Sequence, residues 1–189
     1  MEAKLELSGR QWARKFPGSE DTRQLSGNFR LAVEEFISAM REAGIKVKIN
    51  ATFRPTKRSY LMHYSYRIAK NGYDSKKVPS MPGVNINWDH GTKEESVKAA
   101  KDMTSALDIQ TLQTKPALRS QHNAGLAIDM NISWGKAIEI KDASGHVVKI
   151  NTLPRTGMNK QLIEVAKTYG VRKYNGPGRD FPHWSNNGH

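Results

Sequence analysis

The sequence predicts an α+β fold in which helices flank a small, mostly antiparallel sheet. Apolar residues recur at helical spacing in some stretches and alternate in others, and turn-forming residues separate the two kinds of stretch. The chain has 189 residues, of which 37% are hydrophobic, so it is long enough to bury the core of one compact domain. We therefore expect residues 1–189 to form a single domain.

The first expected helix covers residues 26–44 and is followed at once by a strand. The helix carries a stripe of apolar residues and ends at a glycine: Leu31, Phe36, Ile37, Met40 and Gly44. In residues 45–53 apolar and polar residues alternate strictly, which predicts a half-buried strand packed against that helix. Arg54 follows the strand and shares the face of Thr52, opposite the core.

Two more helices are expected in the middle of the chain. Residues 56–71 show helical spacing and are followed by Gly72, and Thr92-Lys93-Glu94-Glu95 is typical of a capping box that begins a helix reaching about residue 107. Between them, residues 73–91 are rich in proline and glycine. A connection of this length is often functional, and we expect it to form a wall of a substrate groove.

Residues 119–132 predict a turn followed by a strand that presents polar side chains on one face. In a strand over residues 126–132, the apolar residues at even positions face the core and Asp129 faces the other way. His122 lies in the preceding turn, where Gly125 gives the backbone the freedom to fold back. The imidazole and the carboxylate can therefore converge on one ion.

The remaining elements lie in the last third of the chain. Residues 136–141 and 146–150 predict a hairpin, Asn159 predicts the start of a helix that ends near Tyr169, and residues 171–174 predict a short strand. A turn over Asn175–Gly178 follows, and Pro182 keeps its neighbours out of a helix. A bend is needed between Asp180 and His183, because a regular strand would point them to opposite faces.

Together these segments supply two imidazoles and two carboxylates, from His122, Asp129, Asp180 and His183. A catalytic zinc site needs three protein ligands, an open position and a base. The chain has no cysteine, so its metal ligands would have to be histidines and carboxylates. Taken singly, each residue is more often structural, since an aspartate can cap a turn or pair with a basic neighbour such as Arg179. Their joint occurrence favours the zinc site.

The two motifs resemble those of the zinc D-alanyl-D-alanine carboxypeptidases and L-alanyl-D-glutamate endopeptidases, a family that includes vancomycin-resistance dipeptidases and many phage endolysins. The similar residues are Ser120-x-His122-x-x-Gly125-x-Ala127-x-Asp129 and Asp180-x-Pro182-His183. The resemblance implies a hedgehog/D-Ala-D-Ala-peptidase-like fold with one Zn²⁺. It implies His122, Asp129 and His183 as zinc ligands, Asp180 as the catalytic carboxylate, Arg54 as a catalytic and substrate-binding residue, and Ser120 as a substrate contact. An aspartate at position 180 is closer to the phage endopeptidases, since the dipeptidases usually have glutamate.

The chemistry of such a site is consistent with peptide hydrolysis. Water on a zinc ion with these ligands can lose a proton near pH ~7 rather than ~15.7. Asp180 would take this proton and later give it to the leaving amine, while zinc and Arg54 stabilise the oxyanion. We expect one zinc peptidase domain that cuts peptidoglycan stem peptides, as a phage-type endolysin. A D,D-carboxypeptidase trimming terminal D-alanine is the nearest alternative, and a basic nucleic-acid-binding module is an alternative from another class.

The formal charge of +12 suits an anionic partner. Peptidoglycan and the anionic cell envelope are the expected partners of a monomeric enzyme, and the basic residues form no dense arm typical of a nucleic-acid tail, so we expect no stable nucleic-acid partner. The N-terminal residues contain no apolar run of signal-peptide length. We therefore expect the protein to stay in the cytoplasm of the producing cell and to act on the wall after release.

Overall fold

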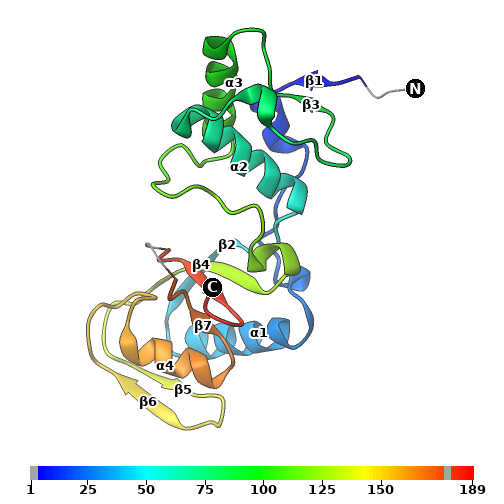
Figure 1. Ribbon diagram of the computed structural model, residues 1–189. Coiled ribbons are helices and arrows are strands. Elements are labelled where there is room, and N and C mark those ends of the chain that lie inside the picture. The colour runs from blue at the N-terminus through cyan, green and yellow to red at the C-terminus, as the bar shows by residue number, and fades with distance from the viewer. Residues whose placement is uncertain (1–3, 177–179) are drawn as a thin grey trace. The chain divides into compact units, whose positions relative to one another are not determined.

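The structure of the protein is a computed structural model that describes residues 4–176 and 180–189. The described residues form four α-helices and several short strands, which confirms the predicted α+β class (Figure 1). The contacts divide the chain into two compact units, residues 1–17 with 55–119 and residues 18–54 with 120–189. A single peptidase domain spanning residues 1–189 stays a prediction.

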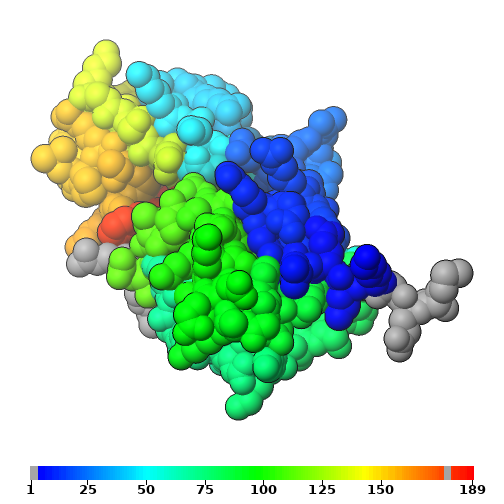
Figure 2. Space-filling view, turned by 90° about the horizontal axis from the view of Figure 1, so that it is seen from above, coloured from blue at the N-terminus to red at the C-terminus, as the bar shows by residue number. Residues whose placement is uncertain are grey.

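The first unit is a helical layer with a very small parallel sheet. Helices α2 (Thr56–Asn71) and α3 (Lys93–Ala106) pack against each other and against the short 3-10 helix Arg10–Arg14. Figure 2 shows this N-terminal segment, in blue, lying against α3, in green. Strands β1 (Glu6–Leu7) and β3 (Ile86–Asn87) pair in parallel. Aromatic and aliphatic side chains from these segments form a core of their own.

The ends of the two long helices of this unit follow the predicted signals. Gly72 ends α2 in the left-handed conformation, with φ 65°. The hydroxyl of Thr92 accepts the backbone N–H of Glu95 at 3.2 Å and donates to the carboxylate of Glu95 at 3.1 Å. The connection 73–91 holds the 3-10 helix Ser75–Lys77 and β3. That this connection forms a wall of a substrate groove stays a prediction.

The second unit is built on a four-stranded antiparallel sheet with the order β2-β4-β8-β7. Its strands are β2 (Lys46–Ala51), β4 (Ala127–Ser133), β8 (His183–Ser185) and β7 (Arg172–Lys173). A separate hairpin pairs β5 (Ile138–Lys141) with β6 (Val147–Ile150), as the sequence predicts. Antiparallel pairing thus dominates, and two of the strands of the main sheet come from the two motif segments.

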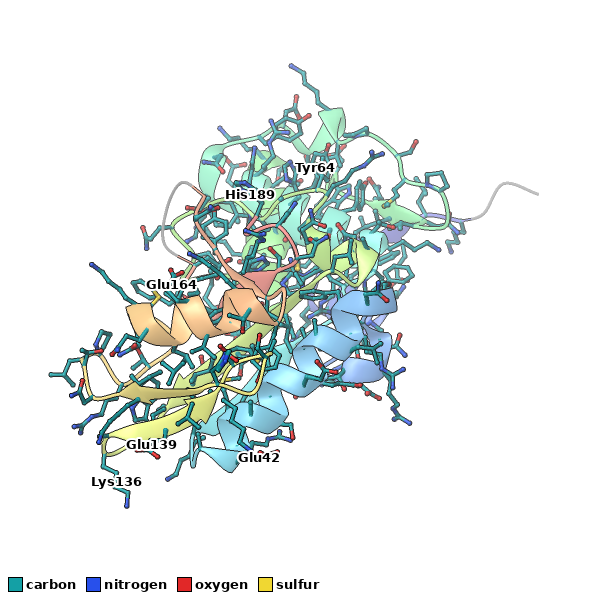
Figure 3. All side chains as sticks on the ribbon, turned by 90° about the horizontal axis from the view of Figure 1, so that it is seen from below. Glu42, Tyr64, Lys136, Glu139, Glu164 and His189 are labelled. Atoms are coloured by element: carbon teal, nitrogen blue, oxygen red, sulfur yellow. The ribbon has the colours of Figure 1, made fainter. Side chains whose placement is uncertain are left out.

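One face of this sheet carries the core of the second unit. Helices α1 (Gly27–Glu42) and α4 (Lys160–Thr168) contribute buried side chains beside those of the sheet, and Asn159 caps α4 by accepting the backbone N–H groups of Gln161 and Leu162. Figure 3 labels exposed polar residues of this unit, namely Glu42 of α1, Glu164 of α4, Glu139 of the β5–β6 hairpin and Lys136 just before it.

The predicted apolar stripe of α1 is wrong at one position. Leu31 is 59% exposed, whereas Phe29 and Val33 are buried. Phe29, Val33, Phe36 and Met40 follow the three- and four-residue steps of one helix face, and Leu31 falls outside that series.

Among the described residues, no helix combines the length and the apolar character needed to cross a membrane. The expected turn over Asn175–Gly178 and the possible partner Arg179 fall partly or wholly on residues 177–179, outside the described residues.

Candidate metal centre

Strand pairing brings together two of the predicted ligands. Asp129 of β4 stands opposite His183 of β8, and the next pair is Ile128 with Trp184. Directly opposite residues in an antiparallel pair share one face of the sheet, and successive residues alternate between faces. Ile128 and Trp184 are fully buried in the core. Asp129 and His183 therefore project together from the other face, as predicted for Asp129.

His122 reaches this face from a tight turn that ends at Gly125. This turn is the 3-10 helix Gln121–Ala124, which contains His122, and Gly125 after it has φ 68° in the left-handed region. A Cβ atom at Gly125 would lie 2.7 Å from Ser26 Oγ and 2.8 Å from the backbone oxygen of Gln24. Position 125 therefore requires glycine both for its conformation and for the close approach of the chain ahead of α1.

The three side chains converge as one group of potential metal ligands. His122 Nε2 lies 3.2 Å from Asp129 Oδ1 and 3.2 Å from His183 Nδ1, and His183 Nδ1 lies 3.1 Å from Asp129 Oδ1. Ligands about 2.0–2.1 Å from a tetrahedral zinc ion stand roughly 3.3 Å from one another. The triangle of ligand atoms therefore has the size that a single tetrahedral ion requires.

Backbone oxygens decide which nitrogen of each imidazole carries a proton. His122 Nδ1 lies 2.8 Å from the oxygen of Thr52, and His183 Nε2 lies 3.2 Å from the oxygen of His189. A backbone oxygen only accepts, so each of these nitrogens donates. In neutral imidazoles the remaining nitrogens then offer lone pairs to the same point as the Asp129 carboxylate. Two imidazole lone pairs and a carboxylate that face one point suit a cation, so these residues fit a bound metal ion.

The charges of the group are strongly coupled. Burial disfavours the carboxylate form of Asp129. When no metal ion lies between the three groups, the imidazole nitrogens that face Asp129 can carry protons, and their hydrogen bonds and positive charge outweigh burial and hold the pKa of Asp129 well below its usual range. Burial likewise opposes the charged form of His183, yet the Asp129 carboxylate outweighs it and raises the pKa of His183. Asp129 is therefore ionised and provides the negative charge of the site.

Asp180 lies three residues before His183 in the chain. The backbone N–H of His183 donates to the oxygen of Asp180 at 3.3 Å, which closes a turn where a bend was predicted. Partial removal of water and the negative charge of Asp129 raise the pKa of Asp180, although His183 and His122 oppose this. The Asp180 side chain is exposed. Its assignment as the catalytic carboxylate stays a prediction.

Arg54 and Ser120 lie on the chain segments next to His122. The backbone N–H of Arg54 donates to the oxygen of His122 at 3.1 Å, and the Asn123 amide donates to the oxygen of Arg54 at 2.7 Å. The same amide side chain accepts the backbone N–H of Ser120 at 2.8 Å. Burial lowers the pKa of Arg54, and the charges of Asp129 and Asp180 oppose that shift. Arg54 thus lies within the field of both carboxylates, while substrate contact by Arg54 and Ser120 stays a prediction.

Three supporting groups were missed by sequence reasoning. Two are the backbone oxygens of Thr52 and His189, which carry no sequence signal because every residue has one. Figure 3 labels His189, the residue that reaches back to His183. The third is Lys173, a buried lysine of β7 whose pKa is lowered to about 8 by burial, against the charges of Asp180 and Asp129. A lysine in a short basic stretch gave no sign of this burial.

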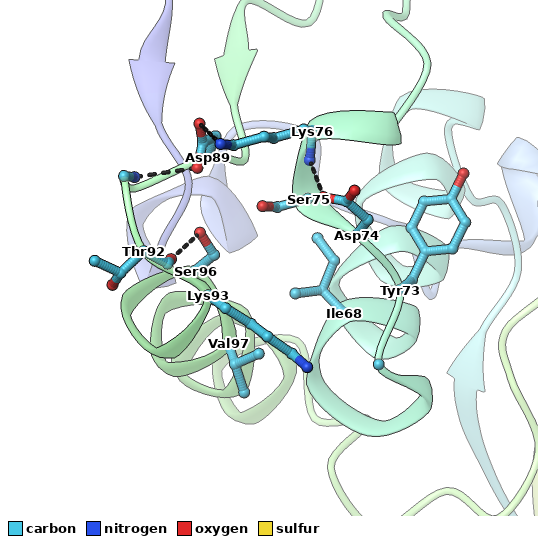
Figure 4. Close-up of a pocket in the computed structure, with 12 residues that line it drawn as sticks. Ile68, Tyr73, Asp74, Ser75, Lys76, Asp89, Thr92, Lys93, Ser96 and Val97 are labelled. Atoms are coloured by element: carbon cyan, nitrogen blue, oxygen red, sulfur yellow. Dashed lines mark hydrogen bonds and ion pairs between the residues drawn. The ribbon is translucent and has the colours of Figure 1, made fainter.

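A cavity of about 410 Å³ lies in the first unit and is separate from this group of residues. It is bounded by the end of α2, the segment after it and the start of α3 (Figure 4). Lys76 pairs there with Asp89 at 3.9 Å. None of the predicted site residues lines this cavity.

Comparison with known proteins identifies no family. No family model matches the chain, and no curated protein matches it. Among solved structures, the chain is similar to a mutant of the vancomycin-resistance D,D-pentapeptidase VanY from a VanB-type resistance cassette, in complex with Zn(II). Identity is 15% over 96% of this chain and 86% of that chain, with a TM-score of 0.41. At this level of similarity, the match assigns neither a fold family nor a function.

Proposed function

We propose that this protein is a zinc-dependent peptidase that hydrolyses peptide bonds in the stem peptides of peptidoglycan. The observation that carries the proposal is the convergence of His122 Nε2, Asp129 Oδ1 and His183 Nδ1 at separations of 3.1–3.2 Å. Two imidazoles and one carboxylate with an open fourth position are typical of catalytic zinc.

The residues around the three ligands have separate roles in this reaction. Zinc held by His122, Asp129 and His183 would act as a Lewis acid and would lower the pKa of coordinated water to about 7. Asp180 accepts the proton of the attacking water and passes it to the nitrogen of the leaving amine. Asp129 keeps its negative charge throughout the reaction. The backbone oxygens of Thr52 and His189 hold the two imidazoles in the tautomers in which the nitrogens that face the metal carry no proton.

Arg54 lies in the same compact unit as the three ligands and contributes a positive charge there. Its guanidinium stabilises the oxyanion that forms when the peptide carbonyl is attacked, or pairs with a carboxylate of the stem peptide. The Asn123 bridge between Arg54 and Ser120 supports this role, because it ties both predicted substrate-contacting residues to the turn that carries His122.

The substrate class rests on the motif resemblance and on the net charge of +12, which favours approach to an anionic envelope. Within that class, the aspartate at position 180 favours a phage-type endolysin that cuts the L-alanyl-D-glutamate bond. Such an enzyme would work as a monomer and reach the wall after release from the cytoplasm of the producing cell.

Digestion of purified peptidoglycan with zinc-loaded protein, followed by mass spectrometry of the muropeptides, tests this function. New amino-terminal D-glutamate and new carboxyl-terminal L-alanine are the expected products. Loss of terminal D-alanine alone would identify a D,D-carboxypeptidase instead. Unchanged muropeptides with protein that has bound zinc would overturn the peptidase proposal.

A further inference from the structure

Lys173 occupies an unusual position for a lysine. It is the second residue of β7, stands opposite Trp184 of β8 and is only 8% exposed. Its ammonium group lies 4.5 Å from the centre of the Trp184 ring. A buried ammonium group loses its hydration, so polar partners have to offset that loss.

Those partners are backbone oxygens of the segment that carries the predicted catalytic residues. The ammonium group of Lys173 donates to the oxygen of Phe181 and, at 3.3 Å, to the oxygen of His183. An ammonium group has three donors, so one lysine can hold both oxygens at once. Pro182 between them has no N–H of its own. Lys173 therefore cross-links the backbone on both sides of this proline.

We propose that Lys173 is a positioning residue of the metal centre, which holds the Asp180–His183 turn so that His183 Nδ1 faces His122 Nε2 and Asp129 Oδ1. The inference rests on the proposed zinc function. Lys173 contacts the backbone of His183 rather than the metal or the substrate, and acts through the orientation of that ligand.

A purely electrostatic role and a positioning role of Lys173 predict opposite changes in zinc affinity when the residue is replaced. Removing a cation near a divalent metal weakens electrostatic repulsion, so Coulomb's law alone predicts tighter zinc binding. Loss of the backbone cross-link predicts weaker binding, because the ligand is no longer held in place. Arg172 offers a matched control, since it is an exposed cation on the same strand.

The test measures zinc affinity by chelator competition and the visible absorption spectrum of the cobalt-substituted protein. We expect Lys173→Met to weaken zinc binding by about 10–100-fold, the usual effect of losing an outer-shell contact, and to alter the cobalt spectrum. Arg172→Met should change neither. Lys173→Gln is the second variant, because its shorter amide cannot reach both oxygens, and weaker binding is expected there too.

Circular dichroism of the metal-free variants shows which of them fold. Unchanged or tighter zinc binding in whichever of Lys173→Met and Lys173→Gln folds would overturn the inference and leave the zinc peptidase proposal intact. Failure of the wild-type protein to bind zinc would instead remove both proposals.

Discussion

His122 Nε2 and His183 Nδ1 lie 3.2 Å apart although the two residues are separated by 61 positions, and the second nitrogen of each ring faces a backbone oxygen. The backbone, rather than further side chains, therefore fixes the tautomer of both imidazoles. Such contacts can be tested only by substitutions that move the backbone.

Gly188 offers such a test for the oxygen of His189. Gly188 has φ 83°, and a Cβ atom there would lie 3.2 Å from Asn175 Oδ1 and 3.2 Å from the oxygen of Lys173. We expect Gly188→Ala to displace the neighbouring His189 oxygen and to weaken zinc binding by about tenfold, as measured by chelator competition.

Gly145 is the matched control for that substitution. It has nearly the same φ, 85°, in the turn of the β5–β6 hairpin, and a Cβ atom there meets no other atom within 4 Å. Gly145→Ala should carry the same backbone strain and leave zinc affinity unchanged. Equal zinc affinities in the two variants would contradict a role for the His189 oxygen.

Asp180→Asn separates metal binding from catalysis. The amide keeps the size of the side chain but cannot accept the proton of the attacking water, so we expect hydrolysis of muropeptides to fall at least ~100-fold. Zinc content and folding should be unchanged, because Asp180 is not one of the three converging ligands. Asp102→Asn, at an exposed position of α3, is the control and should retain full activity. Full activity in Asp180→Asn would remove Asp180 from the mechanism.

Gly125→Ala tests how the turn that carries His122 is built. The left-handed conformation costs a residue with a Cβ atom roughly 1–2 kcal/mol, and the contacts at 2.7 and 2.8 Å add a steric penalty of about 1–3 kcal/mol. Gly72 has φ 65°, and a Cβ atom there would meet no other atom within 4 Å, so Gly72→Ala carries the conformational cost without the steric penalty. Urea denaturation should therefore show a larger loss of unfolding free energy for Gly125→Ala, and equal losses would exclude the close approach.

Local patterns predicted the parts of the fold that depend on neighbouring residues. The alternation over residues 126–132 placed Asp129 on the face away from Ile128, and Asn159 marked the start of α4 correctly. Leu31 was assigned to the wrong face because an isolated leucine fits more than one helical register until the partner surface is known. The two-residue strands β1 and β3 are too short to show any period.

The contacts that hold the candidate ligands in place could not be predicted from the sequence, because they join segments that are far apart in the chain. The carbonyl of Thr52 meets a histidine 70 positions later, and Lys173 meets the backbone of a turn that follows it in the chain. Neither contact uses a residue type or a spacing that a pattern records. The convergence of His122, Asp129 and His183 was predictable, because their residue types and positions match a metal-site pattern, and zinc binding by them stays a prediction.

Zinc binding by the wild-type protein and by variants of its three proposed ligands tests the central claim most directly. Titration of the metal-free proteins should show one zinc per wild-type chain and a large loss of affinity in His122→Ala, Asp129→Ala and His183→Ala. His146→Ala should bind like the wild type, because His146 lies beside the turn of the β5–β6 hairpin, with its side chain 82% exposed. Wild-type zinc affinity in any one of the three ligand variants would contradict the claim that these residues hold one ion together.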